Sequence, residues 1–539
     1  MKINKTSEGS RKTDISGIIY LGIMVVMVMC CRPAWSDTWF VATNGSDATG
    51  SGSDASPWLT ISNAIGHSVD NDTVVISSGI YALDDQLVVT NGITLRTYNN
   101  DRAKVVINGN NYADKLVTNR CLFVNHTNAF ISGLTFSNGV VNIASAFGGG
   151  AILIMTNGTV SNCIITWSKA ADGGGVYMNK GGLLLNSLIS YNFVSNSVFP
   201  SGRGGGIYIN TAGTVRDCTI FTNQAFRSSG HGAGIYLITG GTVDRCDVVS
   251  NIAYGGAIYM NTCGGTIRDT TIRQNYTDDS TIRVADGAGS PIAVITNCTI
   301  MSNIFAFIGC VYFAVPARLE HCDIMYNEST SADDGVNIPV SAIYIASIGS
   351  AKSIIRNCRI MNNSAASAVN NGMAVWIASN AVIENCLISG HDKGGVRTGT
   401  NAYGMILSSC TIANNTKYGV YMNTDAGYTN AVTNYIIYTN GTADITNKVE
   451  ACTNFFWYCC ASNPLPASQG NIASDPLFEG ISTNNYRLAA GSPCINRGIN
   501  LPWMINDVDL DGKKRIMMRN VDIGAYEAWP PSGTIFYGR

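Results

Sequence analysis

Residues 215–223, Val-Arg-Asp-Cys-Thr-Ile-Phe-Thr-Asn, carry a pattern that recurs along the middle of the chain. It consists of an apolar residue, any residue, Asn or Asp, Cys, any residue, Ile or Val, and then Asn three positions later. The pattern returns at 243–251, and further copies centre on Cys163, Ser187, Thr270, Cys298, Cys322, Cys358, Cys386 and Cys410. Successive copies are mostly 24 or 28 residues apart. Because such short units cannot bury a core alone, the copies must stack on one another.

A second phrase, glycines followed by an apolar residue, Tyr and another apolar residue, precedes the first, as at 173–178 and 204–209. Its alternation is typical of a short strand that begins after a glycine bend. Each turn of chain then holds two or three short strands, which pair in parallel with those of the next turn. Since parallel crossovers are almost always right-handed, the repeat predicts an all-β, right-handed parallel β-helix of about a dozen rungs.

The repeat also assigns a role to each of its columns. The Cys column and the Ile or Val two residues later point inward, and the preceding Asn or Asp lies at a bend with left-handed backbone. An Asn five residues after the Cys column predicts a structural ladder of side-chain amides, formed by Asn192, Asn223, Asn251, Asn275, Asn303, Asn327, Asn363 and Asn415. The residue two before the Cys column points outward, and the charges of Arg216, Asp244 and Arg268 predict ion pairs between rungs.

Composition supports strands and turns and excludes other classes of protein. Of the 539 residues, 57 are Gly and 46% are hydrophobic, which is too apolar for a disordered chain. The 34 basic and 36 acidic residues give a net charge of -2, so nucleic acid is not an expected partner. Of the 17 cysteines, those in the ladder are expected to be buried thiols, because stacked neighbours lie too far apart to pair comfortably. Pairing among Cys459, Cys460 and Cys494 stays open.

The first 36 residues are typical of an export signal. Basic residues from Lys2 to Lys12 precede an apolar stretch from Ile15 to Cys31, and Ala34-Trp35-Ser36 fits a cleavage site. An uncleaved membrane anchor is the alternative. No transmembrane span is expected in the mature chain, which we expect to be secreted or held at the cell surface or outer membrane.

Three regions together resemble a known group of proteins. Residues 41–47 and 57–61 resemble the N-terminal signature of secreted bacterial pectate-lyase-like β-helix proteins. The glycine and Asn phrases are similar to repeats of chlamydial polymorphic outer-membrane proteins, and 475–478, 491–498 and 522–527 resemble the choice-of-anchor Q domain. The resemblance implies an exported or surface-displayed protein but no single activity. The 529–539 segment lacks the apolar anchor of that group, so the means of attachment is not assigned.

The expected organisation has five parts: a signal peptide (1–36), an N-terminal cap with the first rungs (37–110), the β-helix (111–465), a choice-of-anchor Q-like domain (466–528) and a tail (529–539). A short amphipathic helix within 58–69 is expected to cover the first rung. The C-terminal domain is expected to close the other end.

The first functional interpretation is an enzyme, a polysaccharide lyase or hydrolase of pectate-lyase-like type. Such an enzyme needs paired carboxylates, or a base with a cation. Gly230-His231-Gly232 precedes Asn423-Thr424-Asp425, which is the reverse of the order in which β-helix galacturonases carry these motifs. The carboxylate pairs Asp278-Asp279 and Asp333-Asp334 are expected in solvated turns. Further lyase candidates that no sequence pattern connects are Lys169, Lys180, Arg203 and His231.

The second interpretation, which the sequence supports better than an enzyme, is binding of an extended polysaccharide, or adhesion. The residue between the two inward apolar ones of the glycine phrase should point outward, and this column reads Tyr177, Tyr208, Tyr236, Tyr259, Tyr312, Tyr344, Trp376 and Tyr421. A row of aromatic faces suits a glycan chain. The alternative is that the rings stack on one another and only stabilise the sheet. A third interpretation is a passive structural spacer.

A cofactor is not required by any of these interpretations. Asp507, Asp509 and Asp511, at alternate positions before Gly512, resemble the start of a calcium loop. Met518 stands where the bidentate Glu of the full motif would be, so Asp522 or Glu527 would have to complete a Ca²⁺ site. Alternatively, the three Asp residues cap turns and pair with Lys513, Lys514 or Arg515.

Overall fold

A computed structural model of the chain describes residues 36–528, with the exception of several loops. The ranges outside the description are 1–35, 110–118, 142–146, 195–201, 226–229, 262–263, 286–291, 307, 331–339, 347–350, 366–371, 379, 401, 403, 424–428, 448–452 and 529–539. The predicted export signal therefore lies outside the described residues. In the part that is described, no helix is long and apolar enough to cross a membrane.

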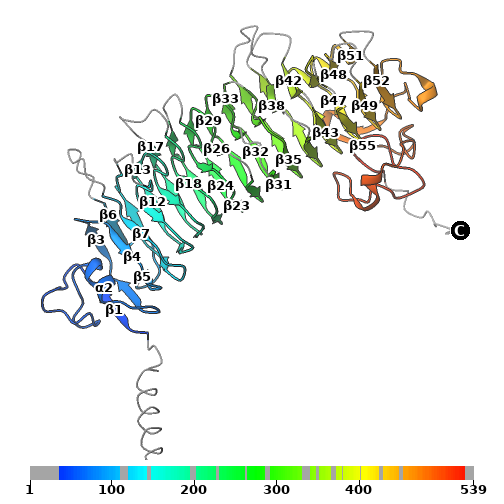
Figure 1. Ribbon diagram of the computed structural model, residues 1–539. Helices are drawn as coiled ribbons and strands as arrows, with labels where there is room; N and C mark the ends of the chain where they lie inside the picture. Colours follow the sequence, from blue (N-terminus) through cyan, green and yellow to red (C-terminus); the bar gives the residue numbers. More distant parts are fainter. Residues whose placement is uncertain are drawn as a thin grey trace, which may run out of the picture.

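The chain winds into a long rod of parallel strands (Figure 1). We number its sheets in the order in which each rung visits them. Their first and last strands are β4 (Leu87–Val89) and β51 (Ala443–Asn447) in sheet I, β1 (Thr38–Val41) and β52 (Thr453–Trp457) in sheet II, β3 (Gly79–Ala82) and β53 (Cys460–Ala461) in sheet III, and β13 (Lys169–Ala170) and β41 (Ser364–Ala365) in sheet IV. Sheets I to III hold 14, 16 and 15 strands, a few more than the dozen rungs expected, and sheet IV holds 8. The predicted parallel β-helix is confirmed.

One rung shows how the repeat folds. β22 (Ile235–Leu237), β23 (Thr242–Asp244), β24 (Asp247–Val249) and β25 (Ile252–Ala253) belong to sheets I to IV in turn. Left-handed residues turn the chain twice, Arg245 (φ 48°) between sheets II and III and Ser250 (φ 55°) between sheets III and IV. The fourth strand was not expected, because two residues are too few to show an alternating pattern.

The centre of the rod is apolar. The Cys column is buried together with the Ile and Val residues of all three long sheets, and every described cysteine is a free thiol. The Cys246 Sγ, for example, lies 3.5 Å from the carbonyl oxygen of Val215 on the preceding rung. Burial raises the pKa of the Cys163 thiol to about 12. The cysteines thus behave as small apolar side chains, as predicted, and Cys460 and Cys494 pack in one smaller cluster.

The predicted Asn ladder is confirmed. From Asn192 to Asn363 the side-chain oxygen of each Asn accepts the backbone N–H of the ladder residue one rung before it, at 2.9 to 3.0 Å. The side-chain amide of each donates to a backbone carbonyl on the preceding rung, as Asn223 does to Ile189 at 2.9 Å. His391 replaces Asn on one rung, where its Nδ1 accepts from the Asn363 N–H at 3.2 Å. These buried amides therefore provide hydrogen-bond partners within the protein for the backbone N–H and C=O groups at the bend between sheets III and IV.

The predicted ion pairs between rungs are also present. The Asp244 Oδ2 lies 2.9 Å from the Arg216 Nε and 3.0 Å from the Arg268 Nη2, on the rungs before and after it. The Arg356 guanidinium pairs in the same way with Glu384. The arginine side chains are 26 to 44% exposed, whereas those of Asp244 and Glu384 are only 0 and 6% exposed. That these pairs set the register of the strands more than they stabilise the rod stays a prediction.

The N-terminal end is closed by the predicted cap. Helix α2 (Ile61–His67) begins after Thr60, whose hydroxyl accepts the Asn63 N–H, and it buries Ile61 and Ala64. Trp58 stacks on Trp39 with ring centroids 5.0 Å apart. The helix therefore covers the open edge of the first strands.

The C-terminal domain lies differently from the prediction, which placed it at the end of the rod. Residues 462–472 cross the end, where Leu465 packs on the central core, and 474–528 lie along the outer side of the last strands of sheet III (Figure 1). The reason is that these strands expose apolar side chains outward, Leu387, Ala413 and Ile436, which β54 (Phe478–Gly480), β55 (Asn485–Leu488) and 521–526 cover. The Asn434 side chain adds a hydrogen bond of 2.8 Å to the Ile499 carbonyl.

Candidate functional site

The outer column of sheet I is the set of residues that alternate with inward apolar residues on this sheet. Register places them one above another as Phe123, Leu153, Tyr177, Tyr208, Tyr236, Tyr259, Arg283, Tyr312, Tyr344, Trp376, Arg397 and Tyr421. All eight aromatic residues of the predicted row share this column. Two arginines, Arg283 and Arg397, interrupt it and were not predicted.

Four of the tyrosines form a tight stack. The ring centroids of Tyr177, Tyr208, Tyr236 and Tyr259 are 4.5, 5.4 and 5.2 Å apart along the column. Each is at most 8% exposed, in a cluster separate from the central core. The rings thus point away from the centre of the rod, as expected, but they cover one another, and their faces are not open to a ligand. Tyr312, Tyr344 and Tyr421 are more exposed.

Polar side chains lie over this stack. Asp172, Arg203 and His231 occupy matching positions on three successive rungs, just before the strands of sheet I. The Arg203 guanidinium makes a bidentate ion pair with Asp172, at 2.9 and 2.8 Å, and lies 5.4 Å from the Tyr208 ring centroid and 5.7 Å from that of Tyr236. The structure therefore brings together two of the predicted lyase candidates, Arg203 and His231, and adds Asp172, which sequence reasoning missed.

His231 is held as a neutral imidazole. Its ring stacks on Tyr259 at 4.4 Å, and burial, assisted by the charges of Arg283 and Arg203, lowers its pKa to about 4. Its Nδ1 is buried and has no hydrogen-bond partner among the described residues. A Cβ at position 255 would lie 2.0 Å from this nitrogen, so Gly255 is required for the ring to fit. A neutral imidazole can accept a proton.

The outer column itself contains two arginines, Arg283 and Arg397, and each lies over aromatic rings. Arg283 pairs with Asp279 and lies 4.6 Å from the Tyr312 ring centroid, and Arg397 lies 4.6 Å from Trp376 and 4.8 Å from Tyr421. Burial raises the pKa of Asp279, and it raises that of Asp172 as well. The prediction that Asp278-Asp279 forms a solvated turn is wrong for Asp279. Its carboxylate pairs with Arg283 of the outer column, and its side chain is only 16% exposed.

The remaining predicted candidates do not join the site. Register places Lys169 in sheet IV, and Lys180 follows the end of β14 (Val176–Met178) as an exposed residue. Asp333, Asp334, Thr424 and Asp425 lie outside the described residues.

The three Asp residues of the calcium prediction already have partners. The Asp509 side chain accepts the N–H groups of Asp511, Lys513 and Glu527, at 2.9, 2.8 and 2.8 Å. Asp511 pairs with Arg487 and Lys513, and Asp507 lies near Arg356. Within the described ranges, no group of three or more His, Cys, Asp or Glu is placed to hold a metal. Calcium binding stays a prediction, and these contacts match the alternative that the residues cap turns.

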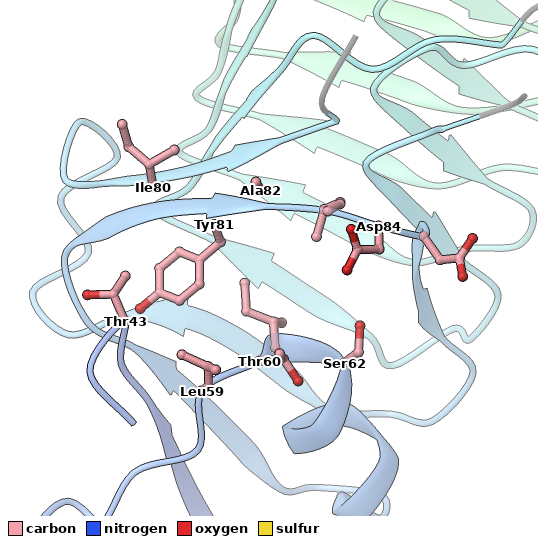
Figure 2. Close-up of a pocket in the computed structure, with 11 residues that line it drawn as sticks. Thr43, Leu59, Thr60, Ser62, Ile80, Tyr81, Ala82 and Asp84 are labelled. Carbon is pink, nitrogen blue, oxygen red and sulfur yellow. The ribbon is translucent and has the colours of Figure 1, made fainter. Parts of the chain in front are cut away.

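A pocket of about 560 Å³ lies against the N-terminal cap (Figure 2). Its lining combines the start of α2 with Tyr81 and the carboxylates of Asp84 and Asp85. Two of its hydroxyls are engaged within the protein, since Thr60 donates to Asp47 at 2.6 Å and Tyr81 to the Ser77 carbonyl at 2.9 Å. The pocket thus follows from the packing of the cap.

Comparison with known families agrees with the architecture. The chain matches the family described as the right handed beta helix region over residues 174–345 and 337–456, which together exceed half of its length. The chain belongs to this family. No curated protein sequence matches it significantly.

Several solved structures resemble this β-helix protein. A point variant of the periplasmic alginate epimerase AlgG is 11% identical, with 60% of this chain and 84% of that one covered and a TM-score of 0.42. Pectate lyase Pel9A is 12% identical, with 92% and 97% covered and a TM-score of 0.26. XylC in complex with xylose is 10% identical, with 91% and 98% covered and a TM-score of 0.30. Scores this low assign neither substrate nor activity. The resemblances to chlamydial repeats and to the choice-of-anchor Q domain stay predictions.

Proposed function

We propose that this β-helix protein is exported and binds an extended polysaccharide along the outer column of sheet I. The observation that carries the proposal is the placement of guanidinium groups over aromatic rings on one face of the rod, with Arg203, Arg283 and Arg397 each lying over two rings. Rings offer surface to the C–H faces of sugars, and fixed polar groups offer hydrogen bonds to hydroxyls. A passive spacer would not require partly exposed ion pairs over aromatic rings on this face.

The ion pairs Asp172–Arg203 and Asp279–Arg283 supply those polar groups in a fixed orientation. Their side chains are 16 to 35% exposed, so they are partly desolvated yet reachable. The buried tyrosine stack beneath them acts as a rigid floor rather than as the contact surface. This arrangement moves the expected sugar contacts from the tyrosine rings to the arginine and aspartate heads and to Tyr312, Tyr344 and Tyr421.

The double variant Arg203→Gln and Arg283→Gln tests this proposal. A glycan array first identifies the retained polysaccharide, and calorimetry then measures its affinity. We expect binding at least about tenfold weaker than wild type, because charged hydrogen bonds are worth about 1.5 to 3 kcal/mol each. The matched control is Arg216→Gln with Arg273→Gln, two arginines that pair with aspartates on sheets II and III. Their side chains are 40 and 37% exposed, against 35% for Arg203 and 21% for Arg283. Equal affinity of both double variants would refute the proposal.

A polysaccharide lyase is the second candidate, and His231 favours it. A lyase needs a base to remove the proton beside a uronate carboxylate, and a cation to stabilise the charge that develops. The neutral His231 imidazole provides an acceptor, and Arg203 and Arg283, whose charges lower its pKa, provide the cations.

Incubation with acidic polysaccharides tests the lyase candidate. If it is correct, ultraviolet absorbance rises as β-elimination creates a double bond, and His231→Gln abolishes that rise while leaving binding intact. Wild-type protein that binds an acidic polysaccharide without forming unsaturated product contradicts catalysis and leaves the binding function in place.

A further inference from the structure

Three aromatic side chains form an exposed stack on a different part of the rod. Trp167 follows β12 (Ile164–Thr166), Tyr191 follows β16 (Leu188–Ser190), and Phe221 ends β20 (Thr219–Phe221), all beside the bend between sheets III and IV. The rings of Trp167 and Tyr191 are parallel within 5° at 4.9 Å, and Phe221 meets Tyr191 edge-on at 5.5 Å. Trp167 is 55% exposed and Tyr191 37%.

The backbone makes these aromatic residues unexpected. Trp167 (φ 52°) and Tyr191 (φ 55°) both lie in the left-handed region, which bulky residues avoid and Asn and Gly tolerate. On other rungs the same bend is formed by Thr222, Ser250, Gln274, Ser302, Tyr326, Asn362 and Asn414. The fold therefore does not need an aromatic residue here, and solvent exposure means that burial in the core does not compensate the strain. Tyr326 also occupies this bend, between Ser302 and Asn362 on the adjacent rungs, so left-handed backbone at an aromatic residue does not by itself mark a site. Trp167 and Tyr191 differ from it because they occupy consecutive rungs and stack on each other while exposed to solvent, and such an exposed aromatic surface suggests a functional requirement.

The stack leaves one surface open. Tyr191 covers one face of the indole, yet Trp167 remains more than half exposed, so the opposite face is in contact with solvent. That face is directed toward the preceding rung, where the same bend carries the small polar residue Asn138 (φ 57°). Lys169 and Phe193, which are in register at the start of sheet IV, lie next to the stack along the chain.

We propose that Trp167, Tyr191 and Phe221 form a second glycan-binding site, in which a pyranose of a β-linked glycan places its flat C–H face on the indole. Flat apolar sugar faces match an open aromatic face. A protein partner fits less well, because three partly exposed rings provide much less area than the roughly 1,200 Å² of a stable protein interface. The net charge of -2 argues against nucleic acid as the ligand. The site shares the ligand class of the proposed function but none of its residues.

Calorimetry with cellohexaose and chitohexaose tests the proposal on the wild-type protein and on Trp167→Ala. We expect wild type to bind at least one of the two, and Trp167→Ala to bind it at least about tenfold more weakly. Trp167→Asn should lose affinity to the same extent, but with a melting temperature equal to or above that of wild type, because Asn tolerates the left-handed backbone. This second variant separates loss of the site from loss of the fold.

Tyr326→Ala is the matched control. Tyr326 occupies the same bend further along the rod, with a φ of 57° and an exposure of 56%, and its substitution should leave affinity unchanged. Absence of binding by wild type, unchanged affinity of folded Trp167→Asn, or an equal loss in Tyr326→Ala would each overturn the proposal. Retained hexasaccharide binding in the Arg203→Gln and Arg283→Gln double variant would show that this site is independent of sheet I.

Discussion

Asn251→Leu is expected to lower the free energy of unfolding by about 3 to 5 kcal/mol, because it leaves several buried polar groups without partners at about 1 to 3 kcal/mol each. The Asn251 side-chain oxygen accepts the Asn223 N–H at 2.9 Å and the Asn223 side-chain amide at 3.1 Å. Its own amide donates to the Ile220 carbonyl at 2.9 Å and to the Asn275 side-chain oxygen at 3.0 Å. Urea unfolding of wild type and variant measures the loss.

Gln274→Leu is the control for that substitution. Gln274 is left-handed like the other residues of its bend and directly precedes the ladder residue Asn275, but its side chain is exposed. Its replacement should change stability by less than about 1 kcal/mol. Asn251→His should be milder than Asn251→Leu, since His391 already occupies one ladder position and accepts the neighbouring N–H. A loss of less than about 1 kcal/mol in Asn251→Leu would show that the ladder is not stabilising.

The ladder could be predicted because each column of a β-helix repeats one physical requirement on every rung. Inward positions need apolar volume, which Cys218 and Ile220 supply, and the bend before Asn223 needs internal hydrogen bonds. The left-handed bend at Asp217 followed from the same pattern. Such requirements appear in the sequence as identities at fixed spacing, so pairing partners far apart in the chain could be assigned without coordinates.

The composition of the outer column could be predicted only in part. Arg283 was missed because Ile282-Arg283-Val284 lacks both the glycines and the Tyr of the phrase, although it lies at the same 24-residue step from Tyr259 that separates many copies. Counting from Tyr259 would have found it. Burial of the Tyr208 and Tyr236 rings could not be predicted, since it depends on ring spacing and on Arg203, which precedes the strand.

The exposed stack of Trp167 and Tyr191 had no visible signal in the sequence. It belongs to a bend between strands of three and two residues, and such short strands show no periodicity. The side-on position of residues 474–528 was hidden for another reason. It depends on which outward side chains of sheet III are apolar, and the repeat constrains only the inward ones.

Glu527 is expected to make the C-terminal domain less stable as pH rises. The carboxyl is buried, and burial raises its pKa to about 9; Asp522 and Asp509 add to the rise, and Arg515, 3.2 Å away, opposes it. In the unfolded chain its pKa is about 4.5. The folded domain therefore holds a proton that the unfolded chain has already lost between these two values. The contribution of Glu527 to the free energy of unfolding is therefore fully present below about pH 4.5. It decreases as pH rises toward 9, by up to about 1.4 kcal/mol per pH unit.

Hydrogen exchange in 475–528, corrected for its intrinsic dependence on pH, measures this effect between about pH 5 and pH 8. Wild-type protection should fall over this interval. Protection in Glu527→Gln should stay nearly constant, because the side-chain amide does not titrate in this pH range. Glu479→Gln, an exposed carboxylate on β54, should behave as wild type. Burial raises the pKa of Asp522 too, so any slope that remains in Glu527→Gln should have the same sign. Protection that increases with pH in the wild-type protein would contradict the assignment and would mean that Arg515 keeps the Glu527 carboxylate ionised inside the domain.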